Sequence, residues 1–152
     1  MKKVVYIDMD GVIASFDSGI AKLNEHLKGV YRNELDLVPN IFAHLDPVDG
    51  AIDAVKRLCK KYDVYILSTA PWRNPTAWSD KLVWLQRWFG EDDDTPLYKR
   101  LILSHHKNLC KGDYLIDDNP DKNGVSEFEG RVLHFGSEDF PNWDTVLDEL
   151  NA

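Results

Sequence analysis

A chain of 152 residues, with 43% hydrophobic and 29% charged residues, has the size and composition of a single globular domain that buries a substantial core. The formal net charge of −8 argues against polymeric nucleic acid as a partner, because phosphate backbones are bound by basic surfaces. No apolar run approaches the length of a membrane span, and the N-terminus turns acidic too early for a signal peptide, so we expect no membrane contact.

Strands and helices alternate along the predicted fold. Short apolar runs predict five strands, at residues 4–7, 64–67, 101–103, 114–116 and 132–135. Their nearly continuous hydrophobicity is typical of parallel strands that are covered on both faces. Between them, apolar residues recur at helical spacing over residues 51–59, 78–89 and 143–150. The sequence therefore predicts an α/β fold, with a Rossmann-like and mainly parallel five-stranded sheet and crossover helices.

Polar side chains follow four of these strands at the point where each strand ends. They are Asp8 and Asp10 after the first strand, Ser68 and Thr69 after the second, His105, His106 and Lys107 after the third, and Asp117 and Asp118 after the fourth. Ligands of open α/β sheets bind beyond the carboxyl ends of the strands. One acidic strand end would indicate a turn, but four converging ends predict a functional site.

The carboxylates in this set suit a hard cation and phosphoryl transfer. Mg²⁺ needs only one or two carboxylates together with waters and substrate phosphate, and it would offset the repulsion between Asp8 and either Asp117 or Asp118. A carboxylate can attack phosphorus and form an aspartyl phosphate, which divides one difficult hydrolysis into two easier steps. Asp10, two residues after Asp8, can protonate the leaving oxygen and then deprotonate water.

Three further residues suit the binding of a phosphoryl group. Gly11 allows a tight turn and a close approach of main-chain amides. Ser68 can donate a hydrogen bond to a phosphoryl oxygen, and Lys107 supplies positive charge where negative charge spreads in the transition state. Lys111 is the competitor of Lys107 for this role.

Ordinary structural roles are the alternative for each candidate. Asp8 and Asp10 could be turn residues, and Lys107 could be a solvated surface lysine, but the convergence of strand ends favours a site. For the adjacent His105 and His106 the two interpretations are balanced, because neighbouring residues rarely face one site together. The acidic run at residues 92–94 suits a solvated loop. Most tryptophans suit helix packing, and only the one at position 72 is placed to reach the pocket.

The order of these motifs resembles the haloacid dehalogenase (HAD) superfamily of aspartate-nucleophile phosphatases. DMDGV begins at Asp8, ST follows the second strand, a lysine follows the third, and LIDD closes the series. In a receiver domain, another α/β fold with an acidic pocket, the acidic pair comes first and the lysine last. Within the superfamily, the chain most closely resembles the 5'(3')-deoxyribonucleotidases over nearly its whole length, through DMDGVIASF, VYILSTAP, LILSHHK and DYLIDDNP.

This resemblance implies a single HAD phosphatase domain over residues 1–152, with a small helical cap inserted at about residues 18–47. It implies that Asp8 is the nucleophile and Asp10 the acid/base. The further implied roles are Mg²⁺ binding by Asp8, the Asp10 carbonyl and one of Asp117 or Asp118, phosphate binding by Ser68, Thr69 and Lys107, and a base pocket lined by Phe16.

Two departures from the family concern the substrate. His105 stands where the family has an arginine, which makes His105 a candidate for substrate contact, and Trp72 is a second candidate because it lies four residues after Ser68. The cap is shorter than in the family's eukaryotic members, and Tyr31 and Phe42 are its only aromatic residues. The expected substrate is a deoxyribonucleoside monophosphate. The alternatives are another small phosphorylated metabolite, or a phosphate-binding module that does not turn over.

Two cysteines and the lack of targeting features bear on location and assembly. Cys59 and Cys110 do not form a metal-type cluster, so we interpret them as reduced thiols of a cytoplasmic protein. The sequence leaves open whether the chain forms a homodimer.

Overall fold

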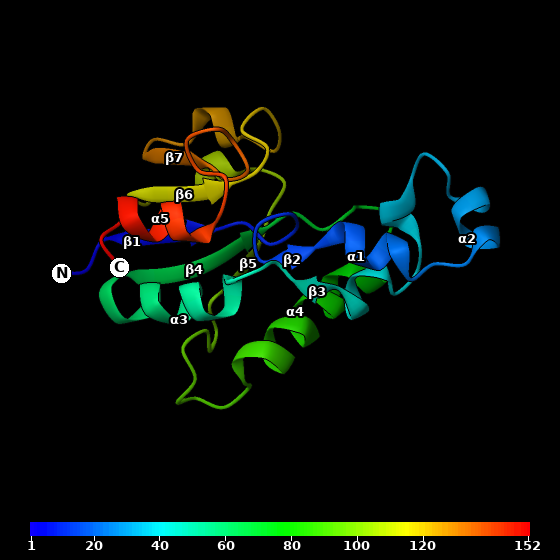
Figure 1. Ribbon diagram of the computed structural model, residues 1–152, viewed down its shortest axis with the longest axis horizontal. Helices are drawn as coiled ribbons and strands as arrows, with labels where there is room; N and C mark the ends of the chain where they lie inside the picture. Colours follow the sequence, from blue (N-terminus) through cyan, green and yellow to red (C-terminus); the bar gives the residue numbers. More distant parts are fainter.

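The computed structural model describes all 152 residues and shows a five-stranded, fully parallel sheet in the order β5-β4-β1-β6-β7 (Figure 1). The strands are β1 (Val4–Ile7), β4 (Asp63–Ser68), β5 (Leu101–Leu103), β6 (Tyr114–Asp117) and β7 (Arg131–His134). All five predicted strands are confirmed, with ends that differ by at most one residue. The chain builds outward from β1 in both directions, so the order reverses at the centre of the sheet, where ligands of such folds bind.

Three helices cover one face and one edge of the sheet. They are α3 (Ala51–Lys61), α4 (Pro75–Phe89) and α5 (Trp143–Glu149); α3 and α5 pack against each other, and in Figure 1 α5 crosses β1 while α3 lies along β4. The larger hydrophobic core lies beneath them and includes Ile7, Ile66, Leu58, Trp84 and Val146. The helical spacing predicted from the sequence is therefore confirmed. None of the helices combines the length and the apolar character that a bilayer span requires.

The opposite face of the sheet carries a smaller core without an α-helix. Tyr6, Leu67, Leu115, Val125 and Phe128 form this cluster, and the 3₁₀ turns η3 (Lys107–Leu109) and η4 (Val125–Glu127) lie in the connections around it. The connection between β6 and β7, for which the sequence gives no helical pattern, contains no α-helix. The intervening sequence NPDKNG contains proline, asparagine and glycine, and its last two residues take left-handed φ angles of 56° and 77°, which favour turns.

A small helical segment leaves the core beside the site. The strands β2 (Ala14–Ser15) and β3 (Asp46–Pro47) pair antiparallel at its base. Between them lie α1 (Phe16–Ala21), α2 (Glu25–Val30) and the 3₁₀ turns η1 (Leu35–Leu37) and η2 (Ile41–His44). We call residues 16–45 the cap. In Figure 1 it projects away from the sheet, with α2 farthest out and both chain termini at the other end of the molecule.

Candidate active site

The carboxyl ends of the central strands meet around one cavity. The register pairs Ile7 with Ile116, so Asp8 and Asp117, the next residues of each strand, lie side by side. Ser68 ends β4 on the other side of β1. A cavity of about 200 Å³ opens here, lined by Asp8, Asp10, Thr69, Lys107, Asp117, Asp118, Asn119 and Asn123. The structure thus brings together residues from every one of the four strand ends singled out in the sequence.

Lys107 lies between two carboxylates at the bottom of this cavity. Its Nζ donates to Asp8 Oδ1 at 2.9 Å and to Asp117 Oδ2 at 2.7 Å. All three residues are buried. The first turn of η3 places the lysine, and its main-chain N–H donates to the Asn123 carbonyl at 2.7 Å. Lys111, the competitor, instead forms an exposed ion pair with Glu129.

Burial changes the acidity of these groups. Loss of solvation raises the pKa of Asp8 to about 7, although the Lys107 charge acts in the opposite direction. Burial also raises the pKa of Asp117. For Lys107, burial lowers the pKa but the two carboxylates raise it by more, so the ammonium keeps its proton. One lysine is therefore shared between two carboxylates that both resist ionisation.

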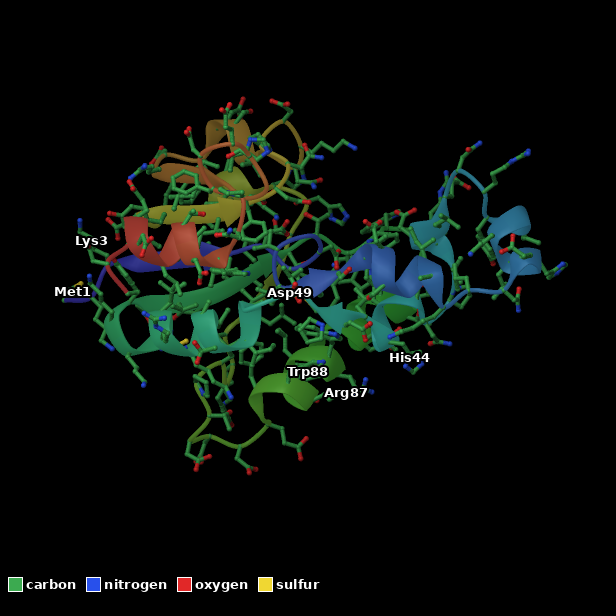
Figure 2. The ribbon with its side chains drawn as sticks, viewed as in Figure 1. Met1, Lys3, His44, Asp49, Arg87 and Trp88 are labelled. Carbon is green, nitrogen blue, oxygen red and sulfur yellow. The ribbon has the colours of Figure 1, made fainter.

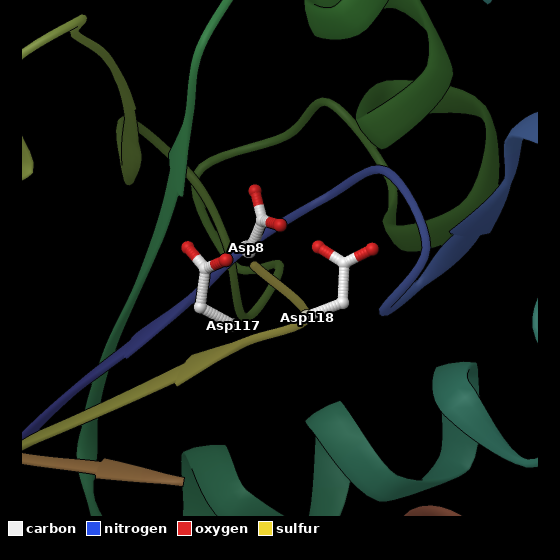
Figure 3. A group of neighbouring side chains, drawn as sticks. All are labelled: Asp8, Asp117 and Asp118. Carbon is white, nitrogen blue, oxygen red and sulfur yellow. The ribbon is translucent and has the colours of Figure 1, made fainter. Parts of the chain in front are cut away.

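Asp118 completes an acidic trio with these two carboxylates. One oxygen from each of Asp8, Asp117 and Asp118 lies within 4.8 Å of the others, and Figure 3 shows the three carboxylates at the ends of β1 and β6. Both oxygens of Asp117 already have partners, because Oδ1 accepts the Asn119 N–H at 2.9 Å. Asp118 is exposed, which leaves it the freer ligand.

Gly11 makes room for Asp118. Its φ angle is +79°, and a Cβ atom built there would lie 2.2 Å from Asp118 Oδ2. Any other residue at this position would meet both a disfavoured backbone conformation and a collision with the carboxylate.

Asp10 is held by a residue that the sequence analysis missed. Lys81, fully buried in α4, donates to Asp10 Oδ2 at 2.6 Å, to Ser68 Oγ at 2.8 Å and to the Thr69 carbonyl at 3.1 Å. The other oxygen of Asp10, Oδ1, is buried without a hydrogen-bond partner. Ser68 Oγ accepts from Lys81, which leaves its own hydroxyl hydrogen for another acceptor, but Ser68 is fully buried and lines neither this cavity nor the one beside Phe16.

A signal for Lys81 was present in the sequence. Ala77, Lys81, Trp84 and Leu85 are spaced as one face of a helix, and all four are buried. A lysine on the apolar face of a helix is unusual unless it is paired. Asn119 and Asn123 were also missed; they follow the acidic pair in a turn-forming sequence that gives no sign of their place in the cavity wall.

The predicted substrate-binding residues fall into two groups. Thr69 lines the cavity, but its hydroxyl donates to the Ser104 carbonyl at 2.7 Å. Phe16 lines a neighbouring cavity of about 340 Å³, which shares Asp10 and Asp118 with the first. Trp72 and His105 line neither cavity.

His105 instead contacts two tryptophans. Its ring centroid lies 6.1 Å from that of Trp72 and 6.0 Å from that of Trp78. Trp72 itself is 80% exposed, and His106 is also exposed. These residues form a small aromatic group on the surface rather than a wall of the cavity.

The charges of the site do not balance. Asp8, Asp10, Asp117 and Asp118 face two lysines, so the fully ionised site carries two excess negative charges. An all-oxygen donor set with this excess fits a hard divalent cation such as Mg²⁺.

Comparison with known proteins agrees with this geometry. A sequence model of the family described as "5' nucleotidase, deoxy (Pyrimidine), cytosolic type C protein" matches residues 19–143. A protein of Vibrio phage KVP40, provisionally named a 5'(3')-deoxyribonucleotidase, is 50% identical over 151 residues, which cover 99% of this chain and 86% of the phage protein. The 5'(3')-deoxyribonucleotidase of Bacillus subtilis is 28% identical over 99% of this chain and 95% of its own length.

The fold has a solved counterpart as well. A provisionally assigned HAD hydrolase from Bacillus subtilis, YfnB, solved with bound magnesium, superimposes with a TM-score of 0.63 over 99% of both chains, at 13% sequence identity. The predicted HAD-type, Rossmann-like fold is therefore confirmed. With the family model covering most of its length, the chain belongs to the deoxy 5'-nucleotidase family of phosphoric monoester hydrolases.

Proposed function

We propose that this chain hydrolyses deoxyribonucleoside monophosphates to nucleoside and inorganic phosphate, through a phosphorylated Asp8 and with Mg²⁺ as cofactor. The observation that carries the proposal is the pairing of Asp8 with Lys107 at the end of β1, beside Asp10 with one unpartnered oxygen. A nucleophile and a proton donor thus stand two residues apart at one cavity.

The first step transfers the phosphoryl group to the chain. Lys107 holds Asp8 Oδ1, so Oδ2 is the oxygen that attacks phosphorus. The new bond joins this oxygen to phosphorus, and the bond from phosphorus to the ester oxygen breaks. Asp10, whose carboxyl group is held by Lys81, gives its proton to the departing oxygen.

The second step releases phosphate. Asp10, now a carboxylate, takes a proton from a water molecule, which attacks phosphorus and displaces Asp8. The bond between phosphorus and Asp8 breaks, and both aspartates return to their starting state. Lys107 stabilises the charge on the phosphoryl oxygens in both steps.

The acidic trio suits the cofactor. Asp8, Asp118 and the Asp10 carbonyl would hold Mg²⁺, while Asp117, whose oxygens are both occupied, would position Lys107. When bound, the cation supplies positive charge that offsets the two excess carboxylates and polarises the phosphoryl group. Asp8 can then act as a carboxylate despite its raised pKa.

The nucleoside has a neighbouring space to occupy. The cavity lined by Phe16 and Val48 adjoins the phosphate site through Asp10 and Asp118, and an aromatic ring there suits stacking with a base. Phe16 is in turn packed against Phe42 of the cap, with ring centroids 5.5 Å apart.

We also propose a cytoplasmic location, which the two free cysteines support.

Phosphate release from a panel of substrates tests this function. Deoxyribonucleoside 5'- and 3'-monophosphates, ribonucleotides and sugar phosphates would be compared with Mg²⁺ and with excess chelator. We expect the deoxyribonucleotides to have the highest kcat/KM and the chelator to stop turnover. Acid quenching with labelled nucleotide should trap a phosphoprotein that Asp8→Asn lacks. A preference for sugar phosphates would assign the site to another metabolite, and no hydrolysis would indicate a binding module.

A further inference from the structure

Lys81 is a buried cation without an evident need in the fold. It is fully buried in the middle of α4, and its three N–H groups are all used, on Asp10, Ser68 and the Thr69 carbonyl. A buried ion pair is a weak source of stability, because a well-packed apolar side chain of similar length often serves as well. This arrangement therefore calls for a role beyond packing.

The contacts of Lys81 hold the carboxyl group of Asp10 through one of its two oxygens. Oδ2 is fixed at 2.6 Å from the ammonium, whereas Oδ1 is buried and has no partner. Fixing one oxygen also fixes the plane of the carboxyl group. Proton transfer depends steeply on the position of the donor, so a carboxyl group that could rotate would spend much of its time out of place.

The cap covers this lysine with an aromatic ring. Phe42, in η2, lies with its ring centroid 4.6 Å from Lys81 Nζ and is itself 2% exposed. A cation over an aromatic face is attracted to it, and more strongly where water is excluded. The ring thus shields the ammonium from solvent and keeps its hydrogen bonds directed at Asp10 and Ser68.

The same helix that carries Lys81 also holds the cap. Trp84 Nε1 donates to the Leu45 carbonyl at 2.7 Å, and Arg87 donates to the Ala43 carbonyl at 3.2 Å. Just before α4, Asn74 Nδ2 donates to the carbonyls of Asp36 and Val38, at 2.8 and 3.2 Å. Figure 2 shows Arg87 on α4 and His44 at the end of η2 on the same side of the molecule. Docking of the cap on α4 therefore brings Phe42 over Lys81.

We propose that Lys81 is a positioning residue for Asp10, and that Phe42 makes this positioning depend on the docked cap. Lys81 touches neither the cavity nor, by this geometry, the substrate; it acts through the carboxyl group that it holds. The proposal rests on the proposed function only in requiring hydrolysis of a phosphate monoester. It ties the cap to proton transfer as well as to substrate binding.

Comparison of two leaving groups separates positioning from a structural role. A deoxyribonucleoside monophosphate expels an alkoxide and needs a proton from Asp10, whereas 4-nitrophenyl phosphate expels a stable phenolate and needs little help. For Lys81→Met we expect kcat on the nucleotide to fall by about 100-fold or more, and kcat on the aryl ester by about tenfold or less, with KM for both within about threefold.

Phe42→Leu should also lower kcat on the nucleotide more than kcat on the aryl ester, but by a smaller factor than Lys81→Met. Loss of the cation–π contact should lower kcat on the nucleotide about threefold to tenfold and leave the aryl ester nearly unchanged. Because leucine is also apolar, we expect this variant to fold, so it can still test the proposal if Lys81→Met does not fold. Val146→Ala, on the buried face of α5, is the matched control: it should lower Tm without changing the ratio of the two kcat values.

Equal losses on the two esters in Lys81→Met, or an unchanged ratio in Phe42→Leu, would overturn the inference and leave the proposed function standing. Any alkyl phosphate that the parent hydrolyses can replace the nucleotide in this comparison. A parent that hydrolyses neither ester would overturn the proposed function and the inference together.

Discussion

The site has two halves, one around Asp8 and one around Asp10, and they differ in the balance of their charges. Asp8 shares Lys107 with Asp117 and lies near Asp118, so three carboxylates face one ammonium. Asp10 has Lys81 to itself, and the remaining partners of that lysine are neutral oxygens. The Asp8 half needs an added cation to become neutral, while the Asp10 half is neutral from the chain alone. The Asp8 half is therefore suited to take up metal and phosphate, and the Asp10 half to hold a proton carrier in a fixed position.

The largest effect should come from the Asp8 half. Asp8→Asn keeps the shape of the side chain but removes the nucleophile and a ligand of the metal, so turnover should fall by at least about 10⁴-fold. Phosphate release under saturating nucleotide measures this, with circular dichroism to show that the fold is retained. Substantial activity in the folded variant would contradict a covalent mechanism.

The Asp10 half should respond differently. Asp10→Asn should slow nucleotide hydrolysis by about 10²- to 10⁴-fold and slow 4-nitrophenyl phosphate much less, because only the alkoxide needs protonation. Similar losses on both substrates would mean that Asp10 serves the metal as much as the proton, and the contrast between the halves would then fail.

Metal binding should depend on the Asp8 half in a graded way. Asp118→Asn removes the freer carboxylate and should weaken Mg²⁺ binding by more than about 100-fold, whereas Asp117→Asn should weaken it by about tenfold, the size typical of a supporting contact. The rise of Tm with Mg²⁺ concentration measures both constants. A reversed order would make Asp117 the direct ligand.

The pH dependence of stability in chelator should distinguish the halves again. Burial raises the pKa of Asp8 from 3.8 to about 7, so the native state holds this proton more tightly than the unfolded chain does. The resulting stability is complete below about pH 4 and is lost as the pH rises through about 7. Tm of the parent should fall over this window, and Asp8→Asn, which has no such proton to lose, should fall less and exceed the parent at about pH 8.

Adding Mg²⁺ checks this interpretation. It should remove most of the fall in Tm that the parent shows at high pH, and it should change the Tm of Asp8→Asn little. Parallel Tm profiles of parent and variant in chelator would show that the ionisation of Asp8 does not cost stability.

The smallest effect should come from a substitution that lies outside both the Asp8 half and the Asp10 half of the site. Trp72 is 80% exposed and contacts His105 rather than the cavities, so Trp72→Ala should change KM for the nucleotide by less than about threefold. Phe16→Ala is the comparison, because Phe16 lines the cavity beside the site, and it should raise KM more. A large rise in Trp72→Ala would return this tryptophan to the substrate contacts that the sequence predicts.

Much of this arrangement was readable in the sequence for a simple physical reason. Continuous apolar runs identify strands buried on both faces, and the carboxyl ends of parallel strands share one edge, so Asp8, Ser68 and Asp117 had to lie near one another. The sequence favoured Lys107 over Lys111 as the site lysine, and in the structure a 3₁₀ turn directs Lys107 inward while Lys111 forms an exposed ion pair.

The surroundings of two side chains were missed. The spacing of Lys81 with Ala77 and Trp84 puts it on the apolar face of α4, but spacing gives the face of a helix and not what lies opposite it, so its partners could not be predicted. Trp72 was placed near the pocket from its distance along the chain, whereas the loop after β4 turns its ring to the surface.

The close approach of Gly11 to Asp118 has a consequence for library design. A comprehensive mutational scan should find position 11 nearly as intolerant as the catalytic aspartates, although glycine takes part in no bond-making step. Shortening Asp118 in the same clone would remove the collision but not the left-handed backbone requirement, so such double variants should recover expression only in part. Libraries that recombine the two ends of this gene with those of relatives should therefore carry positions 11 and 118 as one linked unit.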